Sequence, residues 1–144
     1  MPRVEPPKLD PRYPHYPTIV HALAFAAEHR ADALGLACLE RELTYGQYAR
    51  AVAALAAVFA EHRVAGERIA YLMRNSLEMA VALYAGMAAR AQAAPLNPNF
   101  TDRELEPLVR DVEPRLIVCD AEFAARAAIP AYNATAISRL LRIR

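Results

Sequence analysis

The sequence predicts an α/β fold: a mainly parallel sheet with flanking helices and a short N-terminal β-hairpin. Short apolar runs alternate with segments of helical periodicity along most of the chain, which is the pattern of βαβ units. The stretch from Gly66 to Asn99 contains one complete unit, because it holds an apolar strand, a capped helix and a second apolar strand. With 144 residues, the chain is long enough for one domain with a substantial core.

The composition argues against binding to nucleic acids or membranes. The net charge is +1, with 17 basic and 16 acidic residues, so there is no positive excess to attract a polyanion. No uncharged apolar run reaches the roughly 20 residues of a membrane span. The N-terminus is polar and rich in proline, unlike a signal peptide. We therefore expect a soluble, cytoplasmic protein with no nucleic-acid partner and no membrane span.

The N-terminal elements follow from proline content and capping residues. Residues 1–17 hold six of the eleven prolines, so we expect an extended arm there. Thr18 is a suitable N-cap for a helix that ends near Arg30. The apolar run 34–39 predicts the first strand of a β-hairpin, with its turn at Glu40-Arg41.

The next helix has the clearest start signal. Thr44 and Gln47 match a capping box, in which each side chain binds the backbone of the other residue. Apolar side chains then recur at helical spacing and predict one buried stripe: Tyr48, Val52, Leu55 and Phe59. We expect this helix to end near Arg63, with Gly66 forming the turn into the following strand.

The central βαβ unit is almost entirely apolar. Residues 69–73 form a nearly continuous apolar run, which is typical of a parallel strand covered on both faces. Asn75 or Ser76 caps the following helix, which is apolar around most of its circumference and is therefore expected to be buried. Residues 91–96 form the second strand, and the prolines at its end predict a rigid, extended exit loop.

A second capping box marks the following helix. Thr101 and Glu104 have the required spacing, and apolar residues follow at helical intervals. Pro107 lies inside this helix, where it should cause a kink costing about 3 kcal/mol unless the helix begins later.

The last elements are shorter and less regular. Residues 116–119 form a third strand, and Asp120 is a candidate cap for a helix through Ala128. Beyond this point the apolar pattern fades. We therefore divide the chain into the arm, an α/β segment over 18–130 and an irregular or frayed tail over 131–144.

The sequence contains no visible catalytic or ligand-binding constellation. The four glycines are too far apart for a phosphate-binding loop. Ser76 follows a strand but lacks the flanking glycines of a nucleophile elbow, so a capping role is favoured. His21 and His29 could share a helix face, yet no cysteine or carboxylate joins them at metal-ligand spacing. We therefore assign no catalytic, cofactor-binding or metal-ligating residue.

Three other features have ordinary structural explanations. Cys38 and Cys119 lie in apolar runs and are expected to be buried, reduced thiols. Tyr84 could line a pocket, but core packing with a hydroxyl at the edge is favoured. The loop Pro95–Phe100 follows a strand, where α/β proteins often bind ligands, so a small ligand-binding protein remains a weaker alternative.

Four segments together resemble one enzyme family. They are L-T-Y-G-Q-Y at 43–48, G-E-R-I-A-Y-L-M-R-N-S at 66–76, A-P-L-N-P-N-F-T-D-R-E-L at 94–105 and D-V-E-P-R-L-I-V-C-D at 111–120. In order and spacing they resemble the N-terminal region of AMP-forming acyl- and aryl-CoA synthetases, members of the adenylate-forming superfamily. The chain departs from the family pattern at Arg74, where proline is usual, at 90–93, where a glycine-containing stretch is usual, and at Pro107.

The resemblance implies part of a two-step ligase. In this family a carboxylate attacks the α-phosphate of ATP to give an acyl-adenylate and pyrophosphate, and the thiol of CoA then displaces AMP. The family's phosphate loop, its adenine, Mg²⁺ and ribose motifs and its catalytic lysine have no counterpart in this chain. ATP, Mg²⁺ and CoA are therefore implied for the full-length family, and we expect this chain alone to bind none of them and to be inactive.

Two functional hypotheses rank above the small ligand-binding alternative. The chain is either an N-terminal scaffold fragment of an acid–CoA ligase or a non-enzymatic interaction module that pairs with itself or with a full-length synthetase. The strands that begin at Ile69 and Ala91 would lack neighbours from later sequence, leaving bare sheet edges. We therefore expect self-association or packing against the remainder of a synthetase.

Overall fold

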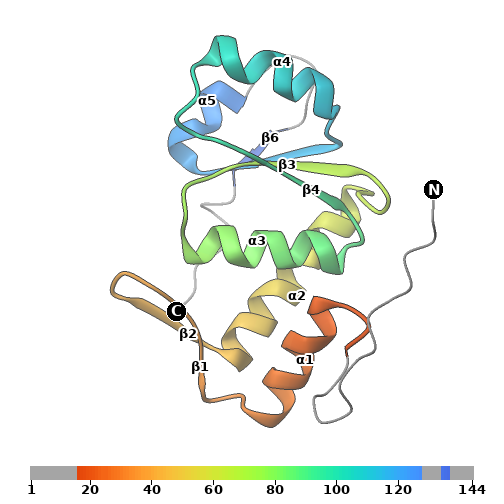
Figure 1. Cartoon of the computed structure of the whole chain (residues 1–144). Coiled ribbons are helices and arrows are strands. Elements are labelled where there is room, and N and C mark those ends of the chain that lie inside the picture. The colour runs from red at the N-terminus through yellow and green to blue at the C-terminus, as the bar shows by residue number, and fades with distance from the viewer. Residues whose placement is uncertain (1–15, 128–133, 137–144) are drawn as a thin grey trace, which may run out of the picture.

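The computed structural model describes residues 16–127 and 134–136 (Figure 1). The helices are α1 (Ile19–His29), α2 (Tyr45–Glu61), α3 (Leu77–Ala88), α4 (Asp102–Val112) and α5 (Ala124–Ala127), with a 3₁₀ turn η1 (Ala121–Phe123) before α5. The strands are β1 (Leu34–Cys38), β2 (Arg41–Thr44), β3 (Arg68–Leu72), β4 (Gln92–Leu96), β5 (Leu116–Cys119) and β6 (Ala134–Ala136). Strands and helices alternate from β3 onward, as the sequence predicts.

The main sheet is parallel and has the strand order β4-β3-β5-β6. Helix α3 and the C-terminal part of α2 cover one face of this sheet and α4 covers the other, while α1 and the antiparallel β1-β2 hairpin lie beyond α3 (Figure 1). The predicted α/β class, the flanking helices and the separate hairpin are therefore confirmed.

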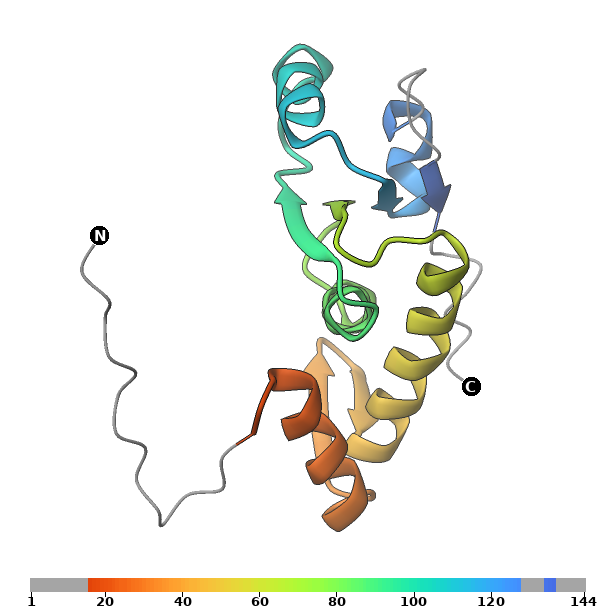
Figure 2. The ribbon, with the colours of Figure 1, turned by 90° about the vertical axis from the view of Figure 1, so that its right-hand side faces the viewer.

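Strand β3 occupies the centre of the sheet rather than an edge. It pairs with β4 on one side and with β5 on the other (Figure 2). The expectation that the strand beginning at Ile69 would lack neighbours is therefore wrong, because β5 returns to its free side. Of the strands predicted to be bare, β4 alone lies at a margin of the sheet.

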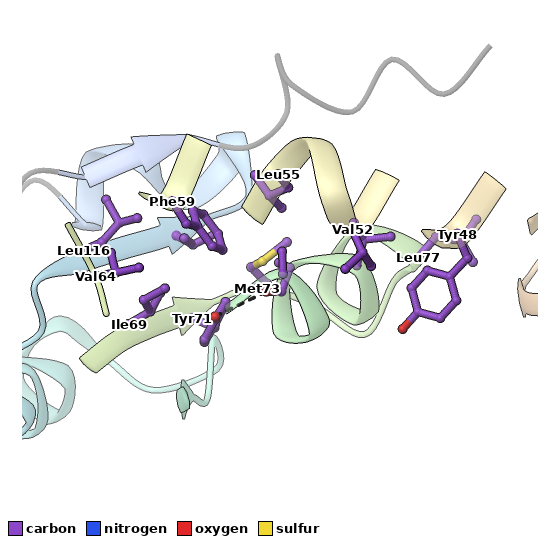
Figure 3. Close-up of a cluster of buried hydrophobic side chains, with 14 of the residues drawn as sticks. Tyr48, Val52, Leu55, Phe59, Val64, Ile69, Tyr71, Met73, Leu77 and Leu116 are labelled. Carbon is purple, nitrogen blue, oxygen red and sulfur yellow. Dashed lines mark hydrogen bonds between the residues drawn. The ribbon is translucent and has the colours of Figure 1, made fainter. Parts of the chain in front are cut away.

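The larger core cluster lies between the sheet and the α2–α3 layer. The predicted stripe of α2 points into it, and Phe59 is only 2% exposed. From β3, Ile69 and Tyr71 project toward this layer, and Leu116 joins them from β5 (Figure 3). Helix α2 is therefore held by its apolar face, as its periodicity predicts.

A second cluster fills the space between the sheet and α4. Ala70 and Leu72 of β3 point to this side, opposite to Ile69 and Tyr71, because successive strand residues alternate between faces. Leu105 and Val109 of α4 cover them. Burial on both faces explains why β3 and β5 read as continuous apolar runs.

Helix α3 approaches β3 closely at Gly86. The Tyr71 hydroxyl donates a hydrogen bond to the carbonyl of Ala82, at 3.3 Å. A Cβ atom at Gly86 would lie 2.1 Å from the Tyr71 hydroxyl oxygen, well inside van der Waals contact. A glycine in mid-helix normally costs about 1 kcal/mol relative to alanine, but here it makes room for a fully buried tyrosine.

Helix α3 is buried, as its composition predicts. One face is fully covered, with residues such as Leu77 and Val81, and the rest of the helix is partly buried except at Met87, which is 41% exposed. The helix lies between the sheet and α2.

The predicted helix caps are largely confirmed. The Thr18 and Ser76 side chains accept hydrogen bonds from the backbone N–H groups three residues ahead, those of His21 and Met79. Thr44 and Gln47 form the complete capping box, with distances of 2.8 and 3.3 Å. Asp120 is the exception, because its side chain makes no capping bond and accepts a bond from another loop instead.

The hairpin turn differs by one residue from the prediction. Cys38 pairs with Arg41, so the turn consists of Leu39 and Glu40 rather than Glu40-Arg41. Leu39 has a φ of 54° and is 96% exposed. This left-handed position usually holds glycine or asparagine, which is why the sequence carries no signal for it.

Helix α4 runs through its internal proline. It begins at Asp102, so the alternative of a later start is excluded, and Pro107 lies on the exposed side. Glu113 ends the helix in the left-handed conformation, with φ 45°.

The predicted tail is not entirely irregular, because β6 pairs in parallel with β5 inside it. The rest of that tail, and all of the proline-rich arm except its last two residues, lie outside the described residues. None of the helices in the described part combines the length and apolar character needed to span a bilayer.

The Tyr71–Gly86 contact predicts a strongly coupled pair of substitutions. Gly86→Ala should lower the free energy of unfolding by about 2 kcal/mol, because the new methyl group overlaps the Tyr71 hydroxyl. In a Tyr71→Phe background the same change should cost much less, since the obstructing oxygen is gone and alanine favours helix. Urea unfolding of the four variants measures this coupling. Equal costs in both backgrounds would contradict the close contact.

The ion pair between the hairpin and α3 predicts a local acid sensitivity. Partial burial alone would raise the pKa of Glu78, but its hydrogen bond and ion pair with Arg41 lower this pKa below the ordinary value. A lowered pKa means that the pair stabilises the fold above the carboxylate's unfolded pKa of about 4.5, and that this contribution is lost as the pH falls further. The difference in stability between the parent and Glu78→Gln should be about 0.5 kcal/mol at pH 7 and vanish near pH 3.

Candidate functional site

The carboxyl ends of β3, β4 and β5 meet at one margin of the sheet. The chain leaves β3 toward α3 on one face, whereas it leaves β5 toward Phe123, which packs on the opposite face. Neighbouring strands whose connections diverge in this way form a topological switch point, where open α/β sheets usually bind ligands. This margin is therefore the candidate site to be tested.

Arg74 bridges the two diverging loops. Its backbone N–H donates to Oδ2 of Asp120 at 2.8 Å, and its Nε donates to Oε1 of Glu122 at 2.7 Å. Its guanidinium also lies 5.2 Å from the centre of the Phe123 ring. The hydrogen bond from Arg74 lowers the pKa of the Glu122 carboxyl, so this acid stays ionised at neutral pH. Contacts within the chain thus connect the two loops at the switch point.

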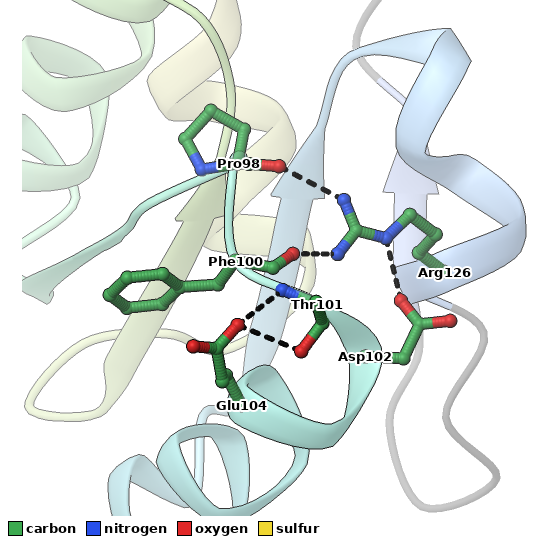
Figure 4. Close-up of polar contacts among 6 residues, drawn as sticks. All are labelled: Pro98, Phe100, Thr101, Asp102, Glu104 and Arg126. Atoms are coloured by element: carbon green, nitrogen blue, oxygen red, sulfur yellow. Dashed lines mark hydrogen bonds and ion pairs between the residues drawn. The ribbon is translucent and has the colours of Figure 1, made fainter.

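Arg126 fixes the loop that follows β4. Its Nη1 donates to the carbonyl of Pro98 at 3.0 Å, and its Nη2 donates to the carbonyl of Phe100 (Figure 4). Its Nε bonds Oδ1 of Asp102 at 2.7 Å, in the first turn of α4. The Arg126 side chain is only 25% exposed. One side chain therefore joins α5, the β4–α4 loop and the start of α4.

The loop itself is also held by local bonds. The Asn97 side chain accepts from the N–H of Asn99 at 3.0 Å, and the Asn97 carbonyl accepts from the N–H of Phe100. Oε2 of Glu104 accepts from both the N–H and the hydroxyl of Thr101, each at 2.7 Å. These two bonds lower the pKa of Glu104. The chain therefore leaves β4 through a hydrogen-bonded turn at Pro98 and Asn99, so the prediction of an extended exit loop is wrong.

Several polar groups at this margin bind one another. The Pro98 and Phe100 carbonyls already accept from Arg126, so these two carbonyls of the predicted ligand-binding alternative, the loop Pro95–Phe100, are not free. Ser76 accepts from the backbone N–H of Met79, as a helix cap does. The candidate site therefore positions loops, and it presents no nucleophile with an adjacent base.

His21 and His29 do not form a metal pair. The ring of His21 bonds the hydroxyl of Thr18, and the ring of His29 bonds the carbonyl of Phe25 and stacks on its ring. In the described ranges, no group of three or more His, Cys, Asp or Glu side chains could hold a metal ion.

Both cysteines are free thiols, but their environments differ. Cys119 is fully buried, and this burial raises the pKa of its thiol. Cys38 is only partly buried, at the end of β1, so the expectation of two buried thiols holds for Cys119 alone. Tyr84 packs against Tyr48, with ring centres 5.3 Å apart, as a core residue would.

Comparison with known proteins identifies the family. The model for AMP-binding enzymes matches residues 23–141. The chain belongs to this family. The matched region corresponds to the N-terminal segment of adenylate-forming synthetases, as the four resembling motifs indicate.

The curated relatives of this AMP-binding segment include several ligases. The 3-hydroxybenzoate–CoA ligase of Aromatoleum sp. (strain CIB) is 32% identical over 99 residues, which cover 68% of this chain and 19% of the ligase. The fatty acid–[acyl-carrier-protein] ligase ScoC of Streptomyces coeruleorubidus is 29% identical over 112 residues, covering 77% of this chain and 22% of that protein. Malpinin synthetase of Mortierella alpina is 28% identical over 118 residues, 81% of this chain but 2% of the synthetase. The chain thus spans about a fifth or less of these relatives.

Solved structures share the fold. The O-succinylbenzoate CoA synthetase of Bacillus subtilis, in complex with ATP and magnesium, superposes with a TM-score of 0.76 and 20% identity over 85% of this chain and 34% of its own. VinN superposes with a TM-score of 0.78 and 22% identity over 85% of this chain and 32% of its own.

Arg74 and Arg126 are the residues that sequence reasoning missed as organisers of this margin. Arg74 stood out as a departure from the family's usual proline, which was the available signal. Arg126 gave no signal, because its three partners lie at least 24 residues earlier in the chain.

The Arg126 contacts predict a loss of local order when they are removed. Arg126→Gln should destabilise the fold by about 1–2 kcal/mol, because two loop carbonyls and Asp102 lose their donor. Hydrogen exchange at Asn99 and Phe100 should accelerate together with this loss. As a matched control, Arg110→Gln breaks an exposed pair within α4 and should cost less than about 0.5 kcal/mol. Equal effects of the two variants would show that Arg126 does not hold the loop.

Proposed function

We propose that this chain provides the N-terminal scaffold segment of an AMP-forming acid–CoA ligase. The observation that carries the proposal is the family match over residues 23–141, joined to a fold shared with one third of a CoA synthetase. Two of the curated relatives are CoA ligases, one of them specific in name for 3-hydroxybenzoate. The substrate class we propose is therefore a carboxylic acid, fatty or aromatic.

The reaction of the complete enzyme proceeds in two balanced steps. A carboxylate oxygen attacks the α-phosphorus of ATP, which gives an acyl-adenylate and releases pyrophosphate. The sulfur of CoA then attacks the acyl carbon, which gives acyl-CoA and releases AMP. ATP, Mg²⁺ and CoA are bound by the assembled enzyme in this proposal.

This chain supplies position rather than reactive groups. Arg74 joins the β3 and β5 loops, and Arg126 joins the β4 loop to α4 and α5, so side-chain contacts connect the loops at the carboxyl margin of the sheet. Rigid placement of loops is a usual requirement for the groups that a neighbouring element presents to a substrate. We therefore propose that the chain alone is inactive.

The partner that we propose is the remainder of a synthetase, supplied on the same or another chain. Large apolar side chains of the described residues remain solvent-exposed, and several are more than 40% exposed: Ile19, Phe25, Leu34, Leu39 and Met87. Surfaces of this kind favour burial against another polypeptide. A second copy of this chain is the alternative occupant, which corresponds to a non-enzymatic interaction module.

A chimera tests the proposed function. The corresponding N-terminal segment of the Aromatoleum 3-hydroxybenzoate–CoA ligase is replaced by residues 18–130 of this chain, and pyrophosphate release is followed with ATP, Mg²⁺, CoA and 3-hydroxybenzoate. We expect turnover by the chimera, none by this chain alone, and a strong loss when the chimera carries Gly86→Ala. A folded but inactive chimera would contradict the scaffold role, and turnover by the isolated chain would contradict its inactivity.

A further inference from the structure

The backbone N–H and C=O groups of β4 point alternately toward β3 and away from the sheet. The N–H of Gln92 donates to the carbonyl of Glu67, at 2.8 Å, so the backbone groups of Gln92 face β3. Successive residues of a strand point their N–H and C=O groups to opposite sides. The backbone groups of Ala94 and Leu96 therefore also face β3, and those of Ala93 and Pro95 face outward.

The pairing of β3 on its other side supports this assignment. The carbonyls of Arg68 and Leu72 accept from Arg115 and Asp120, so the even-numbered residues of β3 face β5. Its odd-numbered residues must then face β4. The register agrees with these directions. In a parallel pair, a residue that bonds the neighbouring strand lies level with one that faces away, and Tyr71 lies level with Pro95 and Leu72 with Leu96.

Proline has no N–H, so the outward edge of β4 offers one donor instead of two. That donor is the N–H of Ala93, and both Ala93 and Pro95 are exposed. The N–H of Ala91, which precedes the strand, is already bonded to the carbonyl of Gly86. Figure 2 shows β4 at the outer margin of the sheet, opposite β6.

We propose that Pro95 closes the β4 margin against strand addition, so that a second copy of this chain does not extend the sheet there. An added strand would need a regular ladder of donors and acceptors along β4. The carbonyl of the added strand that lies opposite Pro95 would face the proline ring and find no N–H donor. The position of the proline matters, because at Ala94 it would break the ladder with β3 instead. A partner of this chain therefore contacts side-chain surfaces or another margin of the sheet.

Restoring the missing N–H donor should allow a second copy of the chain to pair with β4. Pro95→Thr returns an outward N–H and adds a residue that favours strands. Sedimentation equilibrium of the full chain should show self-association of this variant that is about tenfold tighter than that of the parent, since a symmetric β4–β4 contact gains two hydrogen bonds. Pro107→Ala removes another exposed proline, in α4, and should leave self-association unchanged.

A second pair of variants tests the directions of the backbone groups without requiring association. Ala93→Pro removes an outward N–H and should lower the midpoint of urea unfolding only slightly. Ala94→Pro removes an N–H that faces β3, and it should lower this midpoint several-fold more or prevent folding. The proposal is overturned if Pro95→Thr and the parent associate equally. It is also overturned if Ala93→Pro is the more damaging of the two proline variants.

Discussion

The structure depends on strand β3, which is buried on both faces and paired along both edges. Its residues Ile69, Ala70 and Tyr71 are fully inaccessible to solvent. This position fixes the distance of α3 from the sheet, because the Tyr71 hydroxyl fits against Gly86 and bonds the carbonyl of Ala82. The two hydrophobic clusters both include β3, so the α2–α3 layer and the α4 layer are joined through one strand.

The burial of β3 also explains the character of the sheet margin. A strand enclosed on all sides can expose polar groups only beyond its ends. There Arg74 donates hydrogen bonds to Asp120 and Glu122. Both Arg74 and Arg126 lie over the Phe123 ring, with guanidinium carbons 5.2 and 5.8 Å from its centre. The loops after three strands are thus held by charged side chains packed on one buried aromatic ring.

Local features were predictable from the sequence, and long-range ones were not. The capping pair Thr44 and Gln47 lies within one helical turn, so spacing alone identified it. Asp120 was assigned to its own helix, yet it accepts from Arg74, 46 residues earlier, because capping rules do not describe contacts between loops. The order of strands was missed for the same reason, because no residue of the β3 segment indicates that β5 pairs with its second edge. The left-handed turn at Leu39 contradicts turn preferences outright.

In the scaffold role that we propose, these features determine how the segment contributes to an adenylating enzyme. Several polar groups at the carboxyl margin bind one another, so in that role a substitution there acts on the reaction through the position of loops and not through a lost reactive group. The outward edge of β4 lacks a donor at Pro95, so in our proposal added polypeptide is directed to other surfaces. The exposed apolar side chains of α1 and the hairpin are then the better candidates for burial, because apolar contacts need no matching ladder of hydrogen bonds. A scaffold built in this way can join a larger enzyme without changing its own sheet.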